Sequence, residues 1–317
     1  MLFVDLDKTL IKSDFLLESF INYFSKNIFA PLVCIGVCVT KGRAELKKFL
    51  YEKSDISIKN LPYNQKVIDD IFQWKQKHPE KKVFLISATH HEAIESIAKK
   101  LKCFDGWYGT ENKNLKSEVK LKKILELAQG EDFSYIGDSF ADIVIWKNAK
   151  QCILVDPSKG LLKAVKKINN SIKVISNKNR NIFLEIIRTI RIHQWAKNLL
   201  IFIPGVLSLQ SFINVLENTI IGFFAFSFIA SAFYILNDLF DIENDRVHHS
   251  KKNRSFASGS LSITQGFIIF TFLVGSALLI SVRLPQVFQQ MLFLYAVTTF
   301  TYSKYLKKIF SGRRSKN

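Results

Sequence analysis

The stretch MLFVDLDKTL, residues 1–10, decides the fold of the first half of the chain. Its apolar residues at positions 2–4 run directly into Asp5, and Asp7 follows after one apolar spacer. A short apolar run that ends in polar residues is typical of a buried parallel strand whose carboxyl end carries the chemistry. Because side chains alternate along a strand, Asp5 and Asp7 can share a pocket only if the chain turns directly after Asp5. We therefore expect Asp5 at a strand end and Asp7 in the loop that follows.

Two carboxylates this close repel each other, and a cation such as Mg²⁺ between them would relieve that repulsion. The alternative is a strand end with two solvated acids, and the pair alone does not decide between them.

Three later segments carry further polar residues, and in two of them, residues 83–94 and 133–146, these follow an apolar run. VFLISATHHEAI, residues 83–94, contains Ser87, and NLKSEVKLKKIL, residues 114–125, contains Lys120. FSYIGDSFADIVIW, residues 133–146, is an apolar run followed by Gly137, Asp138 and Asp142.

Together with residues 1–10, these segments resemble, in order, the four motifs of the haloacid dehalogenase-like (HAD) phosphohydrolases. The resemblance implies a Rossmann-like α/β domain over residues 1–158 with a helical cap over about 13–60. It implies Asp5 as the nucleophile that forms an aspartyl-phosphate and Asp7 as general acid and base. Ser87 and Lys120 would hold the phosphoryl oxygens. The implied Mg²⁺ ligands are Asp5, Asp7 through its backbone, and Asp138, with Asp142 in support.

Residues 13–60 have helical apolar spacing, and they contain a run of about 13 apolar residues, NIFAPLVCIGVCV, followed by a basic segment. The run is too short to span a bilayer. We expect a buried cap helix over the active site; the alternative is an apolar hairpin that enters the membrane interface.

The net charge of +18 and the sequence pI of about 9.6 raise the question of nucleic-acid binding. The lysines are scattered and no nucleic-acid module organises them, so we expect no nucleic-acid partner and favour anionic lipid. The four cysteines show no metal-ligand spacing. We expect a basic linker over residues 159–184.

Beyond residue 185 the sequence is typical of a membrane domain. Four apolar segments are candidate spans, at residues 198–213, 218–236, 264–282 and 287–303. Positive residues gather before the first span, between the second and third, and after the fourth. Four spans then place both chain ends and the HAD-like domain in the cytoplasm, on a multi-pass protein of the inner membrane.

The segment NDLFDIENDR follows the second candidate span. Its aspartates Asp238, Asp241 and Asp245 are spaced i, i+3 and i+7, which places them on one face of a helix. Three carboxylates at a membrane boundary are costly without a cation, and Mg²⁺ bridging to a pyrophosphate would satisfy them. The alternative is a solvated, charged helix end.

RIHQWAKNLLIF, residues 191–202, and residues 230–262 resemble the UbiA-type prenyltransferases, in particular their polyprenyl-phosphate phosphoribosyltransferase branch. The resemblance implies that Asn237 and the three aspartates bind a Mg²⁺-diphosphate. It also implies contacts between anionic substrates and the basic residues Lys197, Arg246, Lys252 and Arg254. Two positions differ from the pattern HPxKxxRP, because this chain has His249 and Ser255 there.

The resemblance covers about residues 185–308, whereas the family has about nine spans and a second acidic motif. We therefore expect a truncated UbiA-type segment, half of an all-α transmembrane bundle. A shortened gene, a split enzyme completed by a second polypeptide, and a retained membrane anchor all fit this length.

The expected function is that of a Mg²⁺-dependent HAD phosphatase in polyprenyl-phosphate or phosphoribosyl lipid metabolism. Its partners would be a polyprenyl-phosphate lipid, a phosphorylated substrate and the membrane. The rival hypothesis is a catalytically inactive remnant or a scaffold subunit of a split transferase.

Overall fold

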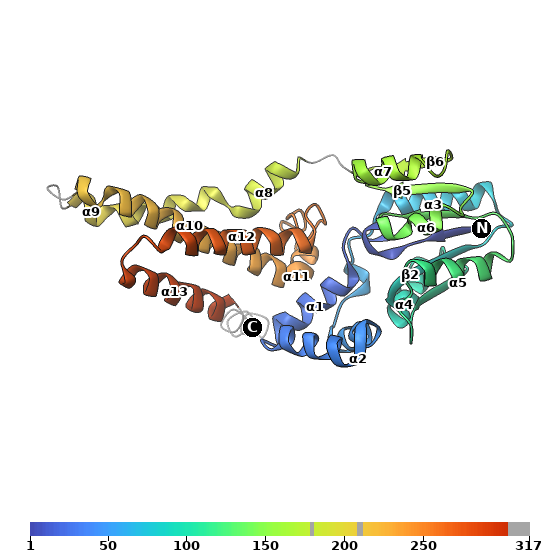
Figure 1. Ribbon diagram of the computed structural model, residues 1–317, viewed down its shortest axis with the longest axis horizontal. Coiled ribbons are helices and arrows are strands. Elements are labelled where there is room, and N and C mark those ends of the chain that lie inside the picture. The colour runs from blue at the N-terminus through green and yellow to red at the C-terminus, as the bar shows by residue number, and fades with distance from the viewer. Residues whose placement is uncertain (178–180, 208–211, 304–317) are drawn as a thin grey trace. The chain divides into compact units, whose positions relative to one another are not determined.

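The computed structural model describes residues 1–177, 181–207 and 212–303 (Figure 1). The chain divides into two compact units, residues 1–179 and 180–317. Each unit has its own core and is described by itself.

A six-stranded parallel sheet forms the centre of the first unit, with the strand order β3-β2-β1-β4-β5-β6. The strands are β1 (Leu2–Val4), β2 (Val83–His90), β3 (Gly106–Thr110), β4 (Ser134–Gly137), β5 (Gln151–Val155) and β6 (Ile172–Ile175). The predicted apolar run at residues 2–4 is therefore the central strand β1, which lies between β2 and β4. This position brings the carboxyl ends of three strands, and the polar residues after them, to one edge.

Apolar side chains leave the sheet alternately toward two cores. Leu2 and Val4 belong to the core on one face, which α3 (Gln65–Lys77) and α4 (His91–Leu101) cover. Phe3 belongs to the core on the other face. The helices there are α5 (Glu118–Ala128), α6 (Ile143–Trp146) and α7 (Lys159–Lys166).

The prediction that residues 159–184 form a linker is wrong for the first part of that range. Helix α7 buries Leu161 and Val165 in the second core, and β6 pairs in register with β5. The sequence of α7 is basic, but its two buried residues are four apart, which is one face of a helix. The sheet domain therefore extends to Ile175. Residues 178–180 of the predicted linker lie outside the described residues.

The predicted cap region, about residues 13–60, contains two helices, α1 (Phe15–Lys26) and α2 (Ala30–Lys53), followed by the short turn η2 (Ile58–Asn60). Asp14 caps α1 by accepting a hydrogen bond from the backbone N–H of Leu17. Gly42 (φ 84°, ψ 178°) breaks α2 in its middle. Only glycine adopts that conformation readily, so the apolar and basic halves of α2 are two helical segments joined at a kink.

The second unit is helical wherever it has regular structure in the described residues. Its elements are α8 (Ile182–Ile190), η4 (Ile192–Phe202), α9 (Ile203–Leu207), α10 (Phe212–Phe240), α11 (Ile242–Val247), α12 (Ile263–Ser281) and α13 (Gln286–Thr301). An apolar core joins α10, α12 and α13 through Ala225, Ile229, Ala277 and Leu292.

Among the described residues, two helices are long and apolar enough to cross a membrane, Val215–Phe240 and Ile263–Ser281. These correspond to the second and third predicted spans. The first predicted span, 198–213, contains the end of η4 and the short α9, and residues 208–211 lie outside the described residues. The fourth coincides with α13, which has 16 residues. A bundle of four spans therefore remains a prediction. The basic tail from residue 304 on also lies outside the described residues.

Candidate active site

Asp5 lies directly after β1, at the carboxyl edge of the sheet. Its backbone N–H donates to the carbonyl of Ile136 in β4, at 3.0 Å. Its carboxylate accepts from the N–H of Leu6 at 2.8 Å, and a single tight turn, η1 (Leu6–Leu10), follows with Lys8 at φ 55°. The chain therefore turns immediately after Asp5, as alternation along the strand requires if both aspartates are to reach one pocket.

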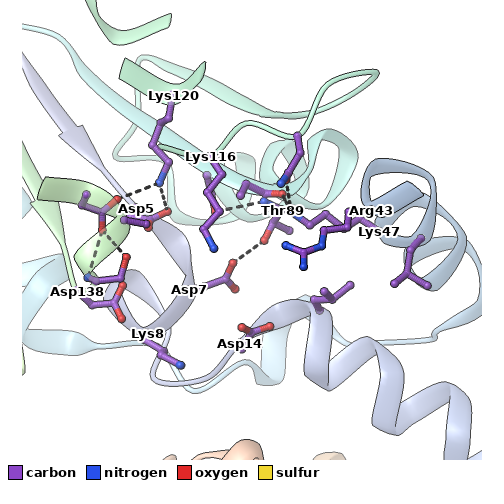
Figure 2. A pocket seen from close by; sticks show the side chains of 18 of the residues that line it. Asp5, Asp7, Lys8, Asp14, Arg43, Lys47, Thr89, Lys116, Lys120 and Asp138 are labelled. Carbon is purple, nitrogen blue, oxygen red and sulfur yellow. Dashed lines mark hydrogen bonds and ion pairs between the residues drawn. The ribbon is translucent and has the colours of Figure 1, made fainter. Parts of the chain in front are cut away.

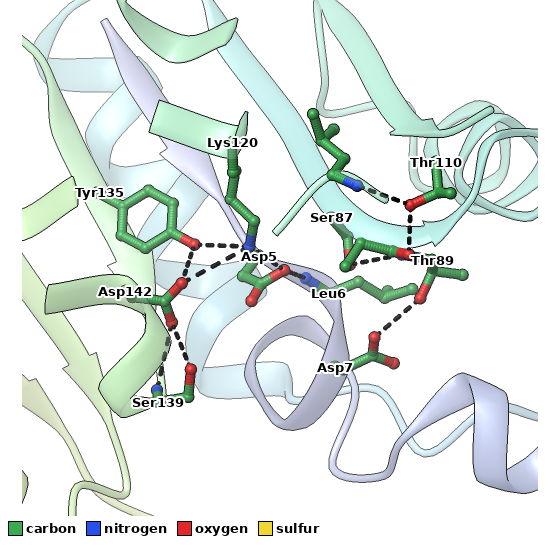
Figure 3. A network of polar contacts seen from close by, with 12 residues as sticks. Asp5, Leu6, Asp7, Ser87, Thr89, Thr110, Lys120, Tyr135, Ser139 and Asp142 are labelled. Carbon is green, nitrogen blue, oxygen red and sulfur yellow. Dashed lines mark hydrogen bonds and ion pairs between the residues drawn. The ribbon is translucent and has the colours of Figure 1, made fainter. Parts of the chain in front are cut away.

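A buried network surrounds Asp5 (Figure 3). Lys120 Nζ, which α5 contributes, lies 3.1 Å from Asp5 Oδ1 and 3.6 Å from Asp142 Oδ1. It donates to the hydroxyl of Tyr135 at 3.0 Å, and that hydroxyl donates to Asp142 Oδ1 at 2.9 Å. Asp142 Oδ2 accepts from Ser139 Oγ at 3.1 Å. Lys120 is therefore held between two carboxylates, with little freedom to move.

Three aspartates form the acidic group of the site. One oxygen each from Asp5, Asp138 and Asp142 lies within 4.8 Å of the others. Hard carboxylate oxygens clustered in this way fit Mg²⁺, which prefers oxygen ligands. Asp142 is also bonded to Tyr135 and Ser139, and its supporting role stays a prediction.

Burial, and the charges of the group, shift several pKa values in the metal-free protein. Burial, and then the carboxylates of Asp5 and Asp142, raise the pKa of Asp138 to about 8. Burial also raises the pKa of Asp5, against the opposing effect of Lys120. Burial by itself lowers the pKa of Lys120, but Asp5 and Asp142 outweigh it and the net shift is upward. Excess negative charge and burial together make this a site that favours a bound cation.

Asp7 lies outside the acidic group of Asp5, Asp138 and Asp142. Its Oδ1 accepts from the backbone N–H of Phe15 at 2.7 Å, and its Oδ2 accepts from Thr89 Oγ1 at 2.8 Å. Burial, and then the carboxylate of Asp14, raise the pKa of Asp7 to about 7. A carboxyl group with a pKa near neutrality can both give and take a proton, which suits a general acid and base.

The predicted residues of the first unit line one pocket of about 360 Å³ (Figure 2). These residues are Asp5, Asp7, Ser87, Lys120, Asp138 and Asp142. Ser87 is buried, and its Oγ accepts from the N–H of Thr89 at 3.3 Å. The structure thus brings all six together from four segments of the chain.

The pocket also contains cations that the motifs do not mark. Arg43 and Lys47 come from the second half of α2, and Lys116 precedes α5. Lys47 Nζ donates to the carbonyl of Ala88 and, at 2.6 Å, to Asn114 Oδ1. The basic segment after the kink is the only sequence signal for Arg43 and Lys47. Thr89 and Tyr135 were also missed, because their roles depend on contacts across the sheet.

A second polar cluster lies in the second unit. Arg191 donates to both oxygens of Asp238, at 2.7 and 2.9 Å, and Arg254 bridges Asp238 and Asp245 at 2.9 Å each. Among the described residues, the oxygens of Asp238, Asp241 and Asp245 do not form a close group like that in the first unit. Two of the three predicted ligands are instead paired with arginines, and their metal role stays a prediction.

The other predicted residues of this unit are spread around that cluster. Asn237, Asp241 and Arg246 are half-buried, and Arg246 donates to the carbonyl of Ala257 at 3.1 Å. Lys252 is exposed, and Lys197 donates to Gln194 at 3.3 Å. Arg191, which the motif comparison did not single out, is the residue that engages Asp238 most directly.

Ser255, where the family pattern has proline, is buried and donates to Glu185 Oε2 at 2.8 Å. Its Oγ also accepts from Thr189 Oγ1 at 3.0 Å. The departure from the pattern therefore ties the loop after α11 to α8.

The fold and the pocket define the first unit as a parallel-sheet α/β domain that resembles the HAD phosphatases. In the second part of the chain, residues 198–313 match the UbiA prenyltransferase family. These two findings agree with the resemblances seen in the sequence and are consistent with a fusion of the two.

The matching relatives are covered only in part by this chain. "Uncharacterized protein y4nM" of Sinorhizobium fredii is 33% identical over 313 residues, which are 97% of this chain and 59% of that protein. "Decaprenyl-phosphate phosphoribosyltransferase" of Mycobacterium tuberculosis is 33% identical over 91 residues, 27% of this chain and 30% of that protein. The chain thus spans less than two thirds of the length of these relatives.

Among solved structures, phosphoserine phosphatase in its apo form aligns with 55% of this chain and 92% of its own, with a TM-score of 0.40 and 16% identity. A phospho-aspartyl intermediate analogue of phosphoserine phosphatase aligns with 57% and 94%, with a TM-score of 0.39 and 18% identity.

Proposed function

We propose that the first unit is a Mg²⁺-dependent phosphatase that hydrolyses a phosphate monoester through an aspartyl-phosphate. The observation that carries the proposal is the buried group at the carboxyl edge of the sheet, where Lys120 lies between Asp5 and Asp142 and Asp138 lies beside them. Phosphoryl transfer depends mainly on positioning and on neutralising charge, and this group supplies both.

The reaction would proceed in two displacements. Asp5 attacks phosphorus, the bond from phosphorus to the ester oxygen breaks, and Asp7 gives its proton to the departing alcohol. Water then attacks the aspartyl-phosphate, Asp7 takes a proton from it, and Asp5 is regenerated as phosphate leaves. Lys120 and Ser87 hold phosphoryl oxygens. Mg²⁺, held by Asp5, Asp138 and the backbone of Asp7, would supply charge neutralisation at the phosphoryl group.

The test is phosphate release from p-nitrophenyl phosphate by the full chain, purified in detergent. We expect release with Mg²⁺ and its loss when EDTA removes the metal. A folded protein that releases no phosphate at any Mg²⁺ concentration would overturn the proposal and favour an inactive remnant or scaffold.

We further propose that the whole chain acts in polyprenyl-phosphate metabolism at the inner membrane, with the phosphatase in the cytoplasm. The UbiA match and the arginine–aspartate cluster support a site for an anionic substrate in the second unit. The phosphatase would remove a phosphate from a phosphoribosylated lipid or a related membrane phosphate. A purified protein that hydrolysed all soluble esters equally and ignored such a lipid would contradict this role.

Thr89→Val should lower kcat about tenfold and leave KM within about twofold, because only the hydrogen bond that orients Asp7 is lost. Steady-state kinetics of p-nitrophenyl phosphate hydrolysis measures both. A rise in KM with unchanged kcat would show that Thr89 contributes to substrate binding and not to the position of Asp7.

Mg²⁺ should bind more tightly as pH rises from 6 to 8. The pKa of Asp138 is raised to about 8 in the metal-free protein, so below that pH the carboxyl holds a proton that Mg²⁺ must displace. The affinity should rise by up to about tenfold per pH unit for one displaced proton, and level off above the pKa. Calorimetry in buffers of different ionisation enthalpy counts the released protons. An affinity that stayed constant across this range would contradict the assignment.

A further inference from the structure

The first half of α2 presents an apolar face that nothing covers in the described structure. Phe29, just before the helix, and Leu32, Ile35 and Val39 within it are 64, 69, 61 and 79% exposed. Leu32, Ile35 and Val39 are spaced i, i+3 and i+7, so they form one stripe along the helix. Ile28 extends it, and we call these five residues the apolar stripe.

The apolar stripe is concentrated, unlike the scattered apolar residues of an ordinary surface. The described residues of the first unit have ten large apolar side chains that are exposed, and five of them lie in the twelve positions 28–39. The opposite side of the same helix is buried at Ala30 and Cys34. The helix therefore packs normally with one side and leaves the other, equally apolar side in contact with solvent.

Basic residues follow the apolar stripe along α2. Residues 40–53 contain five cations and two acids. Lys41, Arg43 and Lys48 are exposed. An apolar helix face beside exposed cations is the composition of helices that lie in the interface of an anionic membrane.

The chain itself gives a reason to expect a membrane. Its second unit contains two helices of spanning length, and only six residues separate β6 from α8. A protein partner would have to be recruited, whereas the first unit is tethered by this short connection to helices that would insert in a bilayer. Among candidate occupants of the apolar stripe, the bilayer is therefore the one favoured by both composition and connectivity.

Helix α2 also forms part of the active-site pocket. Cys38 and, beyond the kink, Arg43 and Lys47 line it, and Lys47 is hydrogen-bonded to the carbonyl of Ala88 next to Ser87. One helix thus carries the apolar stripe in its first half and pocket-lining cations after the kink.

We propose that the apolar stripe lies in the membrane interface, and that the pocket therefore acts on phosphate monoesters carried by lipids. The second clause rests on the proposed phosphatase function, while the first stands on the surface alone. The apolar stripe would lie in the bilayer surface. Arg43 and Lys47 would contact the phosphate of a lipid whose chains stay in the membrane.

Photo-crosslinking tests the location of the stripe. The full chain, with benzoylphenylalanine in place of Ile35, is reconstituted in vesicles of phosphatidylglycerol and phosphatidylcholine and irradiated. Phe72, an aromatic residue of α3 that is 48% exposed, provides the matched control position. We expect lipid adducts from position 35 and few from position 72. Crosslinks from position 35 to a second copy or to residues 180–317 of the same chain would overturn the proposal. The absence of any crosslink from that position would overturn it as well.

Kinetics tests the substrate class with two esters that differ only in chain length, ethyl phosphate and octadecyl phosphate in the same vesicles. We expect kcat/KM to favour the long chain at least about tenfold, and Leu32→Ser/Ile35→Ser to remove most of that preference without changing ethyl phosphate hydrolysis. Equal values for both esters in the unsubstituted protein would refute the lipid-substrate clause. Hydrolysis of neither ester would overturn the phosphatase itself, which the crosslinking result does not depend on.

Discussion

Asp5→Asn should reduce Mg²⁺-dependent phosphate release by at least about 10³-fold. Asparagine has nearly the same shape and still accepts the hydrogen bond from Leu6, but its amide cannot attack phosphorus to form an acyl-phosphate. It also removes one negative charge from the acidic group and so weakens its attraction for the cation. The measurement is phosphate release from p-nitrophenyl phosphate at saturating Mg²⁺, which limits the contribution of the weaker metal binding.

Asp132→Asn is the matched control, because Asp132 is an exposed aspartate of the same unit that pairs with Lys150 on the surface. We expect its activity to be unchanged, since exposed ion pairs contribute little. Circular dichroism establishes that both variants are folded. Activity of Asp5→Asn within tenfold of the unsubstituted protein would exclude Asp5 as the nucleophile.

Lys120→Met should both inactivate and destabilise the first unit. Lys120 is 3% exposed and is the cation between Asp5 and Asp142, so its removal leaves buried carboxylates without their partner. Breaking a buried pair in this way costs about 3–5 kcal/mol. For a unit of this size, that lowers the thermal unfolding midpoint by about 6–20 °C. Phosphate release should fall by at least about 10²-fold, because a group that holds phosphoryl oxygens is lost.

Lys123→Met serves as the comparison on the same helix. Lys123 pairs with Glu126 on the surface, and we expect a shift of less than about 2 °C. Added Mg²⁺ should restore part of the midpoint in Lys120→Met, since it binds only the folded site and supplies positive charge there. A midpoint equal to that of Lys123→Met would show that Lys120 does not neutralise the group.

The central strand and its acidic end were predictable because their signals are local. Leu2, Phe3 and Val4 alternate between two apolar cores, and the need for a turn after Asp5 follows from strand geometry alone. Ser87 and Asp138 could be placed because each follows a recognisable apolar run, whereas Lys120 was placed by the resemblance to the HAD motifs. The apolar character of the second and third candidate spans was also visible within each segment. Helix α12 has the predicted length, and α10 extends beyond the predicted 218–236 at both ends.

The end of the sheet domain was not predictable in the same way. The segment that forms α7 and β6 is short and rich in lysine. Its few apolar residues can be recognised as core residues only from their packing against β5 and in the second core. A strand of four residues at a sheet edge draws its stability from its neighbour, so its own composition gives little signal.

The sequence by itself determined the order of the motifs, the identity of the acidic residues and the apolar character of α10 and α12. All of these are properties of continuous segments or of their order along the chain. Only the tertiary structure decided that Tyr135 bridges Lys120 and Asp142, that Thr89 orients Asp7, and that Arg191 and Arg254 engage Asp238. These partners are separated by 7 to 82 residues, and a hydrogen bond depends on distance in space, which packing of the whole unit sets.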